Sequence, residues 1–270
     1  MNRVQKYGFH KPKQHEQEDK KMRSREIICV TTFRQGNSEN VIKRTRSEVF
    51  LDTAHRILGA GLSLVVVHIE TQESILRMLQ QFGAVLIEQQ TSGMGNIRRE
   101  ALSESQMHFP NARYFCWLEP EKPDLVRFIV PMANQMKKMQ SDFGIFNRID
   151  MASYPTEQAH YYLFCRAVAT QLVGFDIDYA FGPMMMTPAT IPYFLKFSGG
   201  EYGDKWDSIL VPRLHIIKGG IKFSVLPVNF QNDERITRVE SGNVAIVLKR
   251  LEQFNNVIPS LIAEWQLLNE

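Results

Sequence analysis

The chain has 270 residues, of which 44 % are hydrophobic and 23 % are charged. This balance is typical of globular proteins and excludes disorder along the whole length. The net charge of +3 is unevenly distributed, because residues 1–25 hold eight basic and three acidic residues. Residues 26–270 therefore carry 24 basic and 26 acidic residues. This argues against sequence-independent nucleic-acid binding, which needs a dense cationic face.

Residues 1–25 are predicted to form a disordered basic tail, since they combine mixed charge with low hydrophobicity. Such a tail can contact acidic partners or a membrane surface, but a solvated leader is the favoured interpretation. The sequence has no apolar run of the ~20 residues that a membrane span needs, and its start lacks the apolar segment of a signal peptide. The three cysteines have apolar neighbours and no metal-ligand spacing, which predicts buried reduced thiols. We therefore expect a cytoplasmic location.

The first half of the body alternates short apolar runs with amphipathic segments. Strands are predicted at 26–33, 64–69, 84–88 and 113–118, and helices at 40–58, 71–82, from just after Gly95, and at 123–139. Apolar strands that alternate with helices predict a mostly parallel, Rossmann-like α/β sheet covered by helices on both faces. Ligands of such sheets bind at the carboxyl ends of the strands, so the residues that follow each strand are the candidates for function.

The second half is less regular. Helices are predicted at 155–173, from Thr187-Pro188, at 204–218 and at 241–267, with a strand at 221–228 and a polar loop at 229–235. The run Met184-Met185-Met186 is interpreted as adaptable core or as the lining of an acceptor pocket. We expect one domain over 26–270, with a nucleotide-binding half at 26–125 and an acceptor-side half at 126–270.

The ends of the first two strands carry polar candidates. Thr32, Phe33 and Arg34 close the first strand, but residues 31–37 contain one glycine where a dinucleotide-binding turn needs Gly-x-Gly-x-x-Gly. An NAD-type dehydrogenase is therefore disfavoured. Glu70 ends the second strand, where its carboxylate can accept hydrogen bonds from a base or ribose. The alternative for Glu70 is a solvated acid without a ligand.

The segments after the third and fourth strands are more informative. Gly93 and Gly95 open a helix that carries Arg98 and Arg99, which together offer a diphosphate cradle, or else a flexible loop and an exposed basic helix. Glu119-Pro120-Glu121 places two carboxylates after the fourth strand. Two carboxylates and nucleotide phosphates can hold Mg²⁺ or Mn²⁺, although an acid-x-acid pair is also common in turns.

Taken in order, these segments resemble the GT-A class of nucleotide-sugar-dependent glycosyltransferases. The spacing of Gly93 and Arg98 resembles the loop after the third strand of that class, and Leu118-Glu119-Pro120-Glu121 resembles its Asp-x-Asp motif. Phe181-Gly182-Pro183-Met184 is similar to the small-residue segment at the sugar and acceptor site. Residues 203–207 (Gly-Asp-Lys-Trp-Asp) are similar to its acidic acceptor-side motif, and the layout after them is similar to that of mannosylglycerate synthase-like enzymes.

The resemblance implies transfer of a sugar from a nucleotide-diphosphate sugar to an acceptor, assisted by Mn²⁺ or Mg²⁺. It assigns four groups of residues: nucleotide binding by Thr32, Phe33, Arg34, Glu70, Gly93, Arg98 and Glu119; sugar and acceptor binding by Gly182 and Pro183; metal binding by Glu121 and Asp233; and catalysis by Asp204 and Asp207. The two aspartates, three residues apart and thus expected on one helical face, are candidates for the base of an inverting enzyme. A retaining enzyme needs no such base, and a helix-start acidic cluster is the alternative.

Two departures from the class keep other functions open. Both acids of the metal motif are glutamates, and the late loop at 228–235 has no histidine where some relatives supply a metal ligand. A GT-A-like domain that has lost catalysis and serves in binding or scaffolding is therefore an alternative. A sugar nucleotidyltransferase is less favoured, because residues 31–37 lack the Gly-rich basic signature that this class has after the first strand.

Overall fold

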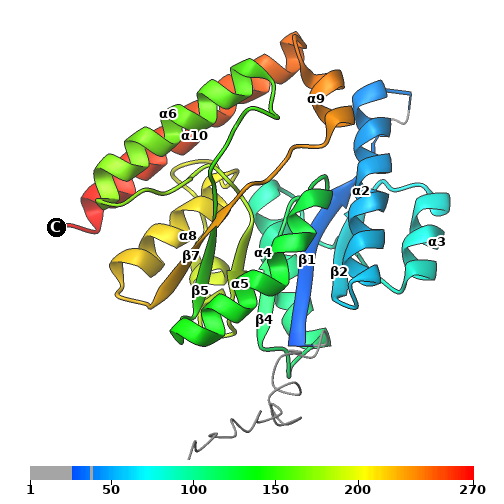
Figure 1. Ribbon diagram of the computed structural model, residues 1–270, viewed down its shortest axis with the longest axis horizontal. Coiled ribbons are helices and arrows are strands. Elements are labelled where there is room, and N and C mark those ends of the chain that lie inside the picture. The colour runs from blue at the N-terminus through cyan, green and yellow to red at the C-terminus, as the bar shows by residue number, and fades with distance from the viewer. Residues whose placement is uncertain (1–25, 37–38) are drawn as a thin grey trace, which may run out of the picture.

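The computed structural model describes residues 26–36 and 39–270, so the expected N-terminal tail lies outside the described residues. Seven strands form one sheet in the order β3-β2-β1-β4-β6-β5-β7 (Figure 1). All neighbouring strands pair in parallel except β6, which is antiparallel to both β4 and β5. The strands are β1 (Ile27–Arg34), β2 (Ser63–Ile69), β3 (Val85–Glu88), β4 (Tyr114–Trp117), β5 (Phe143–Arg148), β6 (Met184–Met186) and β7 (Phe223–Val228).

Helices cover both faces of this sheet. On one side α2 packs against α3 and α5, and on the other α4 packs against α7 and α8. The α-helices are α2 (Val41–Gly59), α3 (Glu73–Phe82), α4 (Met94–His108), α5 (Val126–Met139), α6 (Thr156–Val173), α7 (Ile191–Lys196), α8 (Asp207–Lys218), α9 (Glu234–Glu240) and α10 (Val244–Leu267); a short 3-10 turn, η2, spans Pro123–Leu125. The expected mostly parallel α/β architecture is confirmed.

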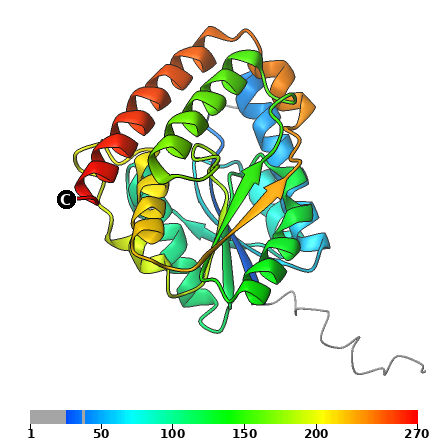
Figure 2. The same cartoon turned by 60° about the vertical axis from the view of Figure 1, so that its left-hand side comes forward.

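The helices α6 and α10 stand apart from these two layers. Figures 1 and 2 show them side by side beyond the ends toward which the arrows of β5 and β7 point. The chain enters α10 through α9, which packs against α2 in the first half of the fold. This arrangement places α10 over the carboxyl edge of the sheet, where parallel sheets bind their ligands.

The second half differs from the sequence-based expectation in three elements. The strand β5 was not predicted, Met184-Met185-Met186 forms the antiparallel strand β6, and the expected polar loop at 229–235 gives way to α9 from Glu234. All three methionines are buried between β4 and β5, which fits the core interpretation and not a pocket lining. No helix in the described part of the chain is long and apolar enough to cross a lipid bilayer.

Candidate active site

A cavity of about 210 Å³ opens at the carboxyl edge of the sheet, beside β4. Its walls come from elements of both halves of the chain. They are α2, the start of α4, the segment after β4, α6, the loop before β6, the start of α8, α9 and the first turns of α10. The charged residues that line it are Arg46, Arg98, Glu119, Glu121, Lys122, Glu240, Lys249 and Arg250. With five cations against three carboxylates, the cavity favours anionic ligands.

Glu119 is held by close packing at the end of β4. A Cβ atom at Gly182 would collide with Oε1 of Glu119, so the carboxylate occupies the space that any other residue at position 182 would fill. The carbonyl of Gly182 accepts a hydrogen bond from Arg213, which also donates to the carbonyl of Phe181 at 2.7 Å. Arg213 is fully buried and burial lowers its pKa to about 10. This arginine thus fixes the loop that Glu119 packs against.

Three buried polar atoms of cavity-lining side chains have no hydrogen-bond partner within the described residues. They are Oε2 of Glu119, Oε1 of Gln158 and Nε of Arg250. Buried polar atoms in folded proteins are almost always paired, so an unpaired one beside a cavity indicates a place where a ligand or water can complete its hydrogen bonding. The acceptor on Glu119 suits a hydroxyl group, and the donor on Arg250 suits an anion.

Arg98 reaches the cavity from the first turns of α4. Its guanidinium donates to the carbonyl of Lys205 at 2.5 Å and to the hydroxyl of Ser208 at 2.9 Å, which ties α4 to the start of α8. Burial lowers the pKa of Arg98 to about 10, while Glu119, Asp207 and Asp204 oppose that shift. Even at this value the guanidinium is charged at neutral pH, so it supplies positive charge in a place with little water.

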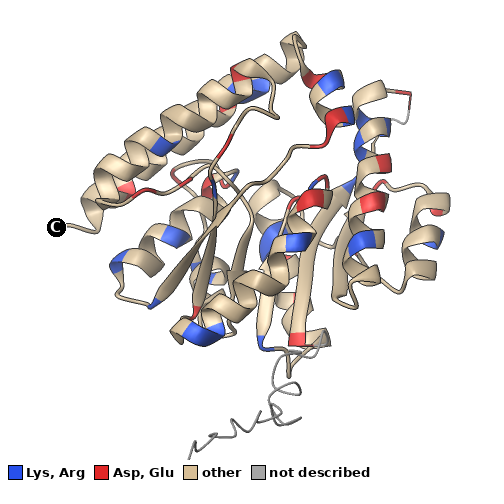
Figure 3. Ribbon diagram, viewed as in Figure 1, with Lys and Arg blue, Asp and Glu red and all other residues tan. Residues whose placement is uncertain are grey.

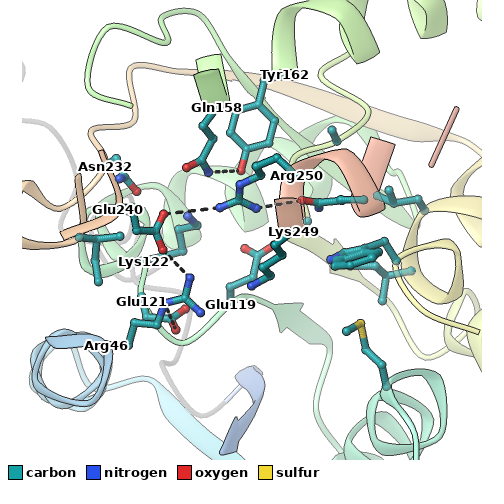
Figure 4. A pocket seen from close by; sticks show the side chains of 18 of the residues that line it. Arg46, Glu119, Glu121, Lys122, Gln158, Tyr162, Asn232, Glu240, Lys249 and Arg250 are labelled. Atoms are coloured by element: carbon teal, nitrogen blue, oxygen red, sulfur yellow. Dashed lines mark hydrogen bonds and ion pairs between the residues drawn. The ribbon is translucent and has the colours of Figure 1, made fainter. Parts of the chain in front are cut away.

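The opposite wall of the cavity is an ion-pair network between α2 and α10. The buried carboxylate of Glu240 accepts a hydrogen bond from Arg46 and lies 3.6 Å from Nη2 of Arg250, while Nε of Arg46 lies 3.8 Å from Oε1 of Glu121 (Figure 4). Lys249 stands next to this network, and burial, with the charges of Arg46 and Arg250, lowers its pKa to about 8. A bound anion here would offset this concentration of positive charge.

The structure brings four of the predicted site residues together in this cavity, namely Arg98, Glu119, Glu121 and Gly182. Pro183 is buried next to Gly182, but it does not line the cavity. Gly93 is the N-cap of α4 with φ 91°, a left-handed conformation for which glycine is suited.

The predicted residues at the ends of β1 and β2 lie outside the cavity. Arg34 and Glu70 pair with each other, with 2.8 Å between Nη2 and Oε1, and both side chains are at least half exposed. Phe33 is buried against Phe50, with 4.4 Å between the ring centroids, and Thr32 pairs with Val67 of β2.

Asp204 and Asp207 do not share a helical face, because α8 begins only at Asp207 and Asp204 precedes it with φ 53°. Asp204 forms an ion pair with Arg99, and its backbone carbonyl accepts a hydrogen bond from the amide of Gly95 at 2.9 Å. Asp207 is fully buried and accepts hydrogen bonds from the amide of Lys205 and from Asn256, while its Oδ2 is unpartnered. Neither aspartate lines the cavity.

The metal prediction rests on Glu121 and Asp233. Glu121 lines the cavity, whereas Asp233 caps α9 through the amide of Arg235 and pairs with the Arg235 side chain at 2.9 Å. The described residues contain no group of three or more His, Cys, Asp or Glu side chains arranged to hold a metal. Mg²⁺ is often held by one or two carboxylates together with substrate phosphates. Glu119 and Glu121 meet that smaller requirement, so the donor set fits a metal only when a diphosphate is bound too.

The sequence did not predict the basic residues Arg46, Lys249 and Arg250 of the cavity, nor Glu240, which pairs with both arginines. Arg46 stands one turn before Phe50, on the buried side of α2, which is a signal that the helix meets something polar there. Lys249 and Arg250 precede the buried Gln253 in the same way on α10. Glu240 gives no local signal, since its burial depends on α2 and α10 meeting in space.

No protein-family model matches the sequence, and no curated protein matches it. Solved structures do match. Glucosyl-3-phosphoglycerate synthase from Mycobacterium tuberculosis, in complex with Mn²⁺, uridine diphosphate and phosphoglyceric acid, superposes with a TM-score of 0.59 at 11 % identity, covering 95 % of this chain and 84 % of that one. Mannosyl-3-phosphoglycerate synthase from Rubrobacter xylanophilus gives 0.53 at 12 % identity, over 88 % and 72 % of the two chains. The fold of this chain is therefore the GT-A-like fold of glycosyltransferases.

Proposed function

We propose that this chain is a glycosyltransferase that takes a sugar from a nucleotide-diphosphate donor and transfers it to an anionic acceptor. The observation that carries the proposal is Glu119, whose side chain lines a cation-rich cavity at the carboxyl edge of a GT-A-like sheet and holds a buried, unpartnered carboxylate oxygen. In this proposal Glu119 accepts a hydrogen bond from the ribose of the donor. Arg98 and Lys122 face the diphosphate and offset the negative charge that grows on it as the sugar departs.

A divalent ion, where one is bound, would be held by Glu119 and Glu121 with the diphosphate and would supply further charge stabilisation. The arginines and lysines act in the same direction as such an ion, since each places positive charge near the leaving group. Asp233 and the nucleotide-binding roles of Thr32, Phe33, Arg34, Glu70 and Gly93 stay predictions, as does the acceptor-side role of Pro183. The location in the cytoplasm likewise stays a prediction.

The acceptor class follows from the wall formed by α2 and α10. Lys249 makes no hydrogen bond or ion pair with any described residue, and Arg250 keeps an unpartnered Nε, so this wall retains positive charge for a ligand. A phosphate or carboxylate on the acceptor would meet these two groups. The phosphoglyceric acid in the M. tuberculosis structure is an acid of this kind.

An inverting reaction also needs a base that deprotonates the acceptor hydroxyl. Neither predicted aspartate lines the cavity, and Asp207 is fully buried with its Oδ2 against Gly199, so the base role of both stays a prediction. Asp204 is engaged by Arg99. A retaining reaction needs neither aspartate, and the stereochemistry of the product would decide between the two possibilities.

The experiment that tests the donor site is thermal unfolding in the presence of UDP, GDP, CDP or ADP, each with Mn²⁺ or with a chelator. We expect one nucleotide to stabilise the fold by about 2.7 kcal/mol at a concentration 100 times its Kd. Glu119→Gln and Arg98→Met should remove that stabilisation, while Glu73→Gln on the exposed surface of α3 should keep it. Lack of stabilisation by all four nucleotides would contradict the proposal. Binding without turnover of the matching nucleotide sugar would instead support the scaffolding alternative.

A further inference from the structure

The outer surface of α6 and α10 is almost free of charge. The structure describes every residue of these two helices, and sixteen of them are exposed. Glu252 alone among the sixteen is charged, and its carboxylate is paired with Lys205. Charged residues make up 23 % of the whole chain and are concentrated at protein surfaces, so their absence here needs a cause. Figure 3 shows the pair of helices mostly in tan.

The exposed residues of α10 follow a helical repeat. Most of them fall three or four positions apart along the entire helix: Val244, Leu248, Leu251, Asn255, Pro259, Ile262 and Gln266. Such a stripe is the pattern of a helix that packs against another surface, yet it lies on the side of α10 away from the cavity-lining Lys249 and Gln253. The helix therefore has two packing faces, and only one of them is satisfied within this chain.

The exposed residues of α6 belong to the same face. They are Thr156, His160, Leu163, Phe164, Ala167 and Gln171. A groove of about 290 Å³ runs between the two helices. Its lining includes His160, Phe164, Leu251 and Phe254, together with two partly buried charged residues, Glu157 and Arg250. Phe164 and Phe254 pack with 5.1 Å between ring centroids, and Phe164 is still half exposed. The two stripes thus form one continuous surface, here called the α6–α10 face.

We infer that the α6–α10 face is the contact surface of a homodimer, in which two copies of this chain pack their α6–α10 faces together about a two-fold axis. The inference does not depend on the proposed enzymatic function. A surface of two adjacent helices can pack on its own copy, because a two-fold axis in the plane of contact sets the same surface of both copies face to face and ridges can enter grooves.

The size of the face fits this partner. At 1.5 Å per residue and about 10 Å per helix width, α6 and α10 together present on the order of 600–700 Å². A stable dimer buries about 800 Å² on each partner, so this face supplies most of what is needed. Most of the exposed residues of this face are apolar, and large exposed apolar patches on a folded protein mark contact sites.

The chemistry of the face favours a protein partner over a membrane. Helices that lie on bilayers carry lysines and arginines along the edge of the apolar stripe, where they meet anionic lipids. The α6–α10 face has no exposed lysine or arginine, and it includes the neutral polar residues Asn255, Gln266 and Gln171. Homodimer interfaces combine an apolar centre with few charges in this way.

Sedimentation equilibrium of the full chain at tens of micromolar tests the inference. We expect a mass of twice the 31.2 kDa of one chain. The double variant Leu248→Glu with Leu251→Glu should weaken the dimer by roughly 100-fold or more, because it buries charge without a partner. Both leucines are more than half exposed in one chain, so the variant should keep the circular dichroism and thermal unfolding of a folded monomer.

Met107→Glu is the matched control, since Met107 is 62 % exposed on α4, away from the α6–α10 face. It should leave the dimer intact. A monomeric wild-type chain, or a double variant that stays dimeric, would overturn the inference. So would a monomeric wild-type chain that binds phosphatidylserine vesicles and loses this binding in the double variant, since that result assigns the face to lipid.

Discussion

At the scale of single residues, the candidate site depends on glycine at position 182, where no side chain occupies the space. Glu119 has space for its carboxylate only because position 182 is glycine, and the left-handed backbone that often explains a glycine does not apply there. The neighbouring Arg213 then fixes that glycine through its carbonyl. Gly182 thus sets the position of the Glu119 carboxylate, although it has no functional side chain of its own.

Gly182→Ala tests this role directly. The added methyl group would meet the far end of a flexible glutamate side chain, so we expect Glu119 to rotate away at a stability cost within about 1 kcal/mol. Nucleoside-diphosphate affinity, measured by calorimetry, should fall at least ~10-fold, since the loss of one hydrogen bond to a charged group costs about 1.5–3 kcal/mol. Gly59→Ala is the control, because nothing lies within 4 Å of its new atom. Wild-type affinity in Gly182→Ala would refute the placement of Glu119.

Residues that act through local order could be predicted from the sequence, and residues that act through distant packing could not. Glu119, Glu121 and Arg98 follow strands or open a helix, so the topology of a parallel sheet already brings them to one edge. Glu240 and Lys249 reach the same cavity because α9 and α10 fold back over that edge. Apolar periodicity describes which face of α10 is buried but not what that face meets.

At the scale of elements, the strand β5 is anchored by an ion pair that contains no exposed atom. Arg148 ends β5 and is fully buried, as is its partner Asp178, with Nη2 of the arginine 3.0 Å from Oδ1. The guanidinium also lies over the rings of Tyr162 and Phe181, 3.8 and 4.2 Å from their centroids. This cluster joins β5, α6 and the segment that leads to Gly182, so it fixes one wall of the cavity.

Asp178→Ala should destabilise the fold by about 3–5 kcal/mol, because it leaves the buried charge of Arg148 without a partner. The comparison is Asp176→Ala, two residues earlier. Asp176 pairs with Arg166, but its side chain is 56 % exposed and such pairs contribute about 1 kcal/mol or less. Urea unfolding of both variants at pH 7 measures the difference. Equal losses in the two variants would show that burial of the Arg148 pair does not matter.

The elements that the sequence did not predict share a physical cause. The strand β6 has three residues, too few for any periodicity, and it exists because its backbone pairs with β4 on one side and β5 on the other. The strand β5 contains Gly144 and Asn147, which are poor strand formers by type, and it ends in the charged Arg148. In both segments, burial inside the sheet favours the strand conformation, because pairing with neighbouring strands satisfies backbone groups that have no other hydrogen-bond partner.

At the scale of the molecule, the sheet and a buried ion-pair network are two of the contacts that join the first and second halves of the fold. The sheet is continuous through β4 and β6, and the buried Glu240 connects α2 to α10 by holding Arg46 and Arg250. Burial alone would raise the pKa of Glu240, but the charges of Arg46 and Arg250 outweigh it and lower that pKa below its ordinary value. The junction is therefore stabilising only while Glu240 is ionised.

Glu240→Gln should consequently destabilise the fold in a pH-dependent way. A carboxylate with a lowered pKa stabilises the folded state above its unfolded pKa of about 4.3, and this contribution is lost as pH falls through the lower folded value. We expect a loss of roughly 1–3 kcal/mol at pH 7 in urea unfolding, and a smaller gap between variant and wild type as pH falls below about 4. Hydrogen exchange along α10 should rise at pH 7, because Arg250 loses its charged partner. Glu234→Gln on the exposed side of α9 should change neither measurement. If Glu240→Gln lowers the free energy of unfolding by the same amount at pH 7 and in acid, the junction is stabilised by packing and not by charge.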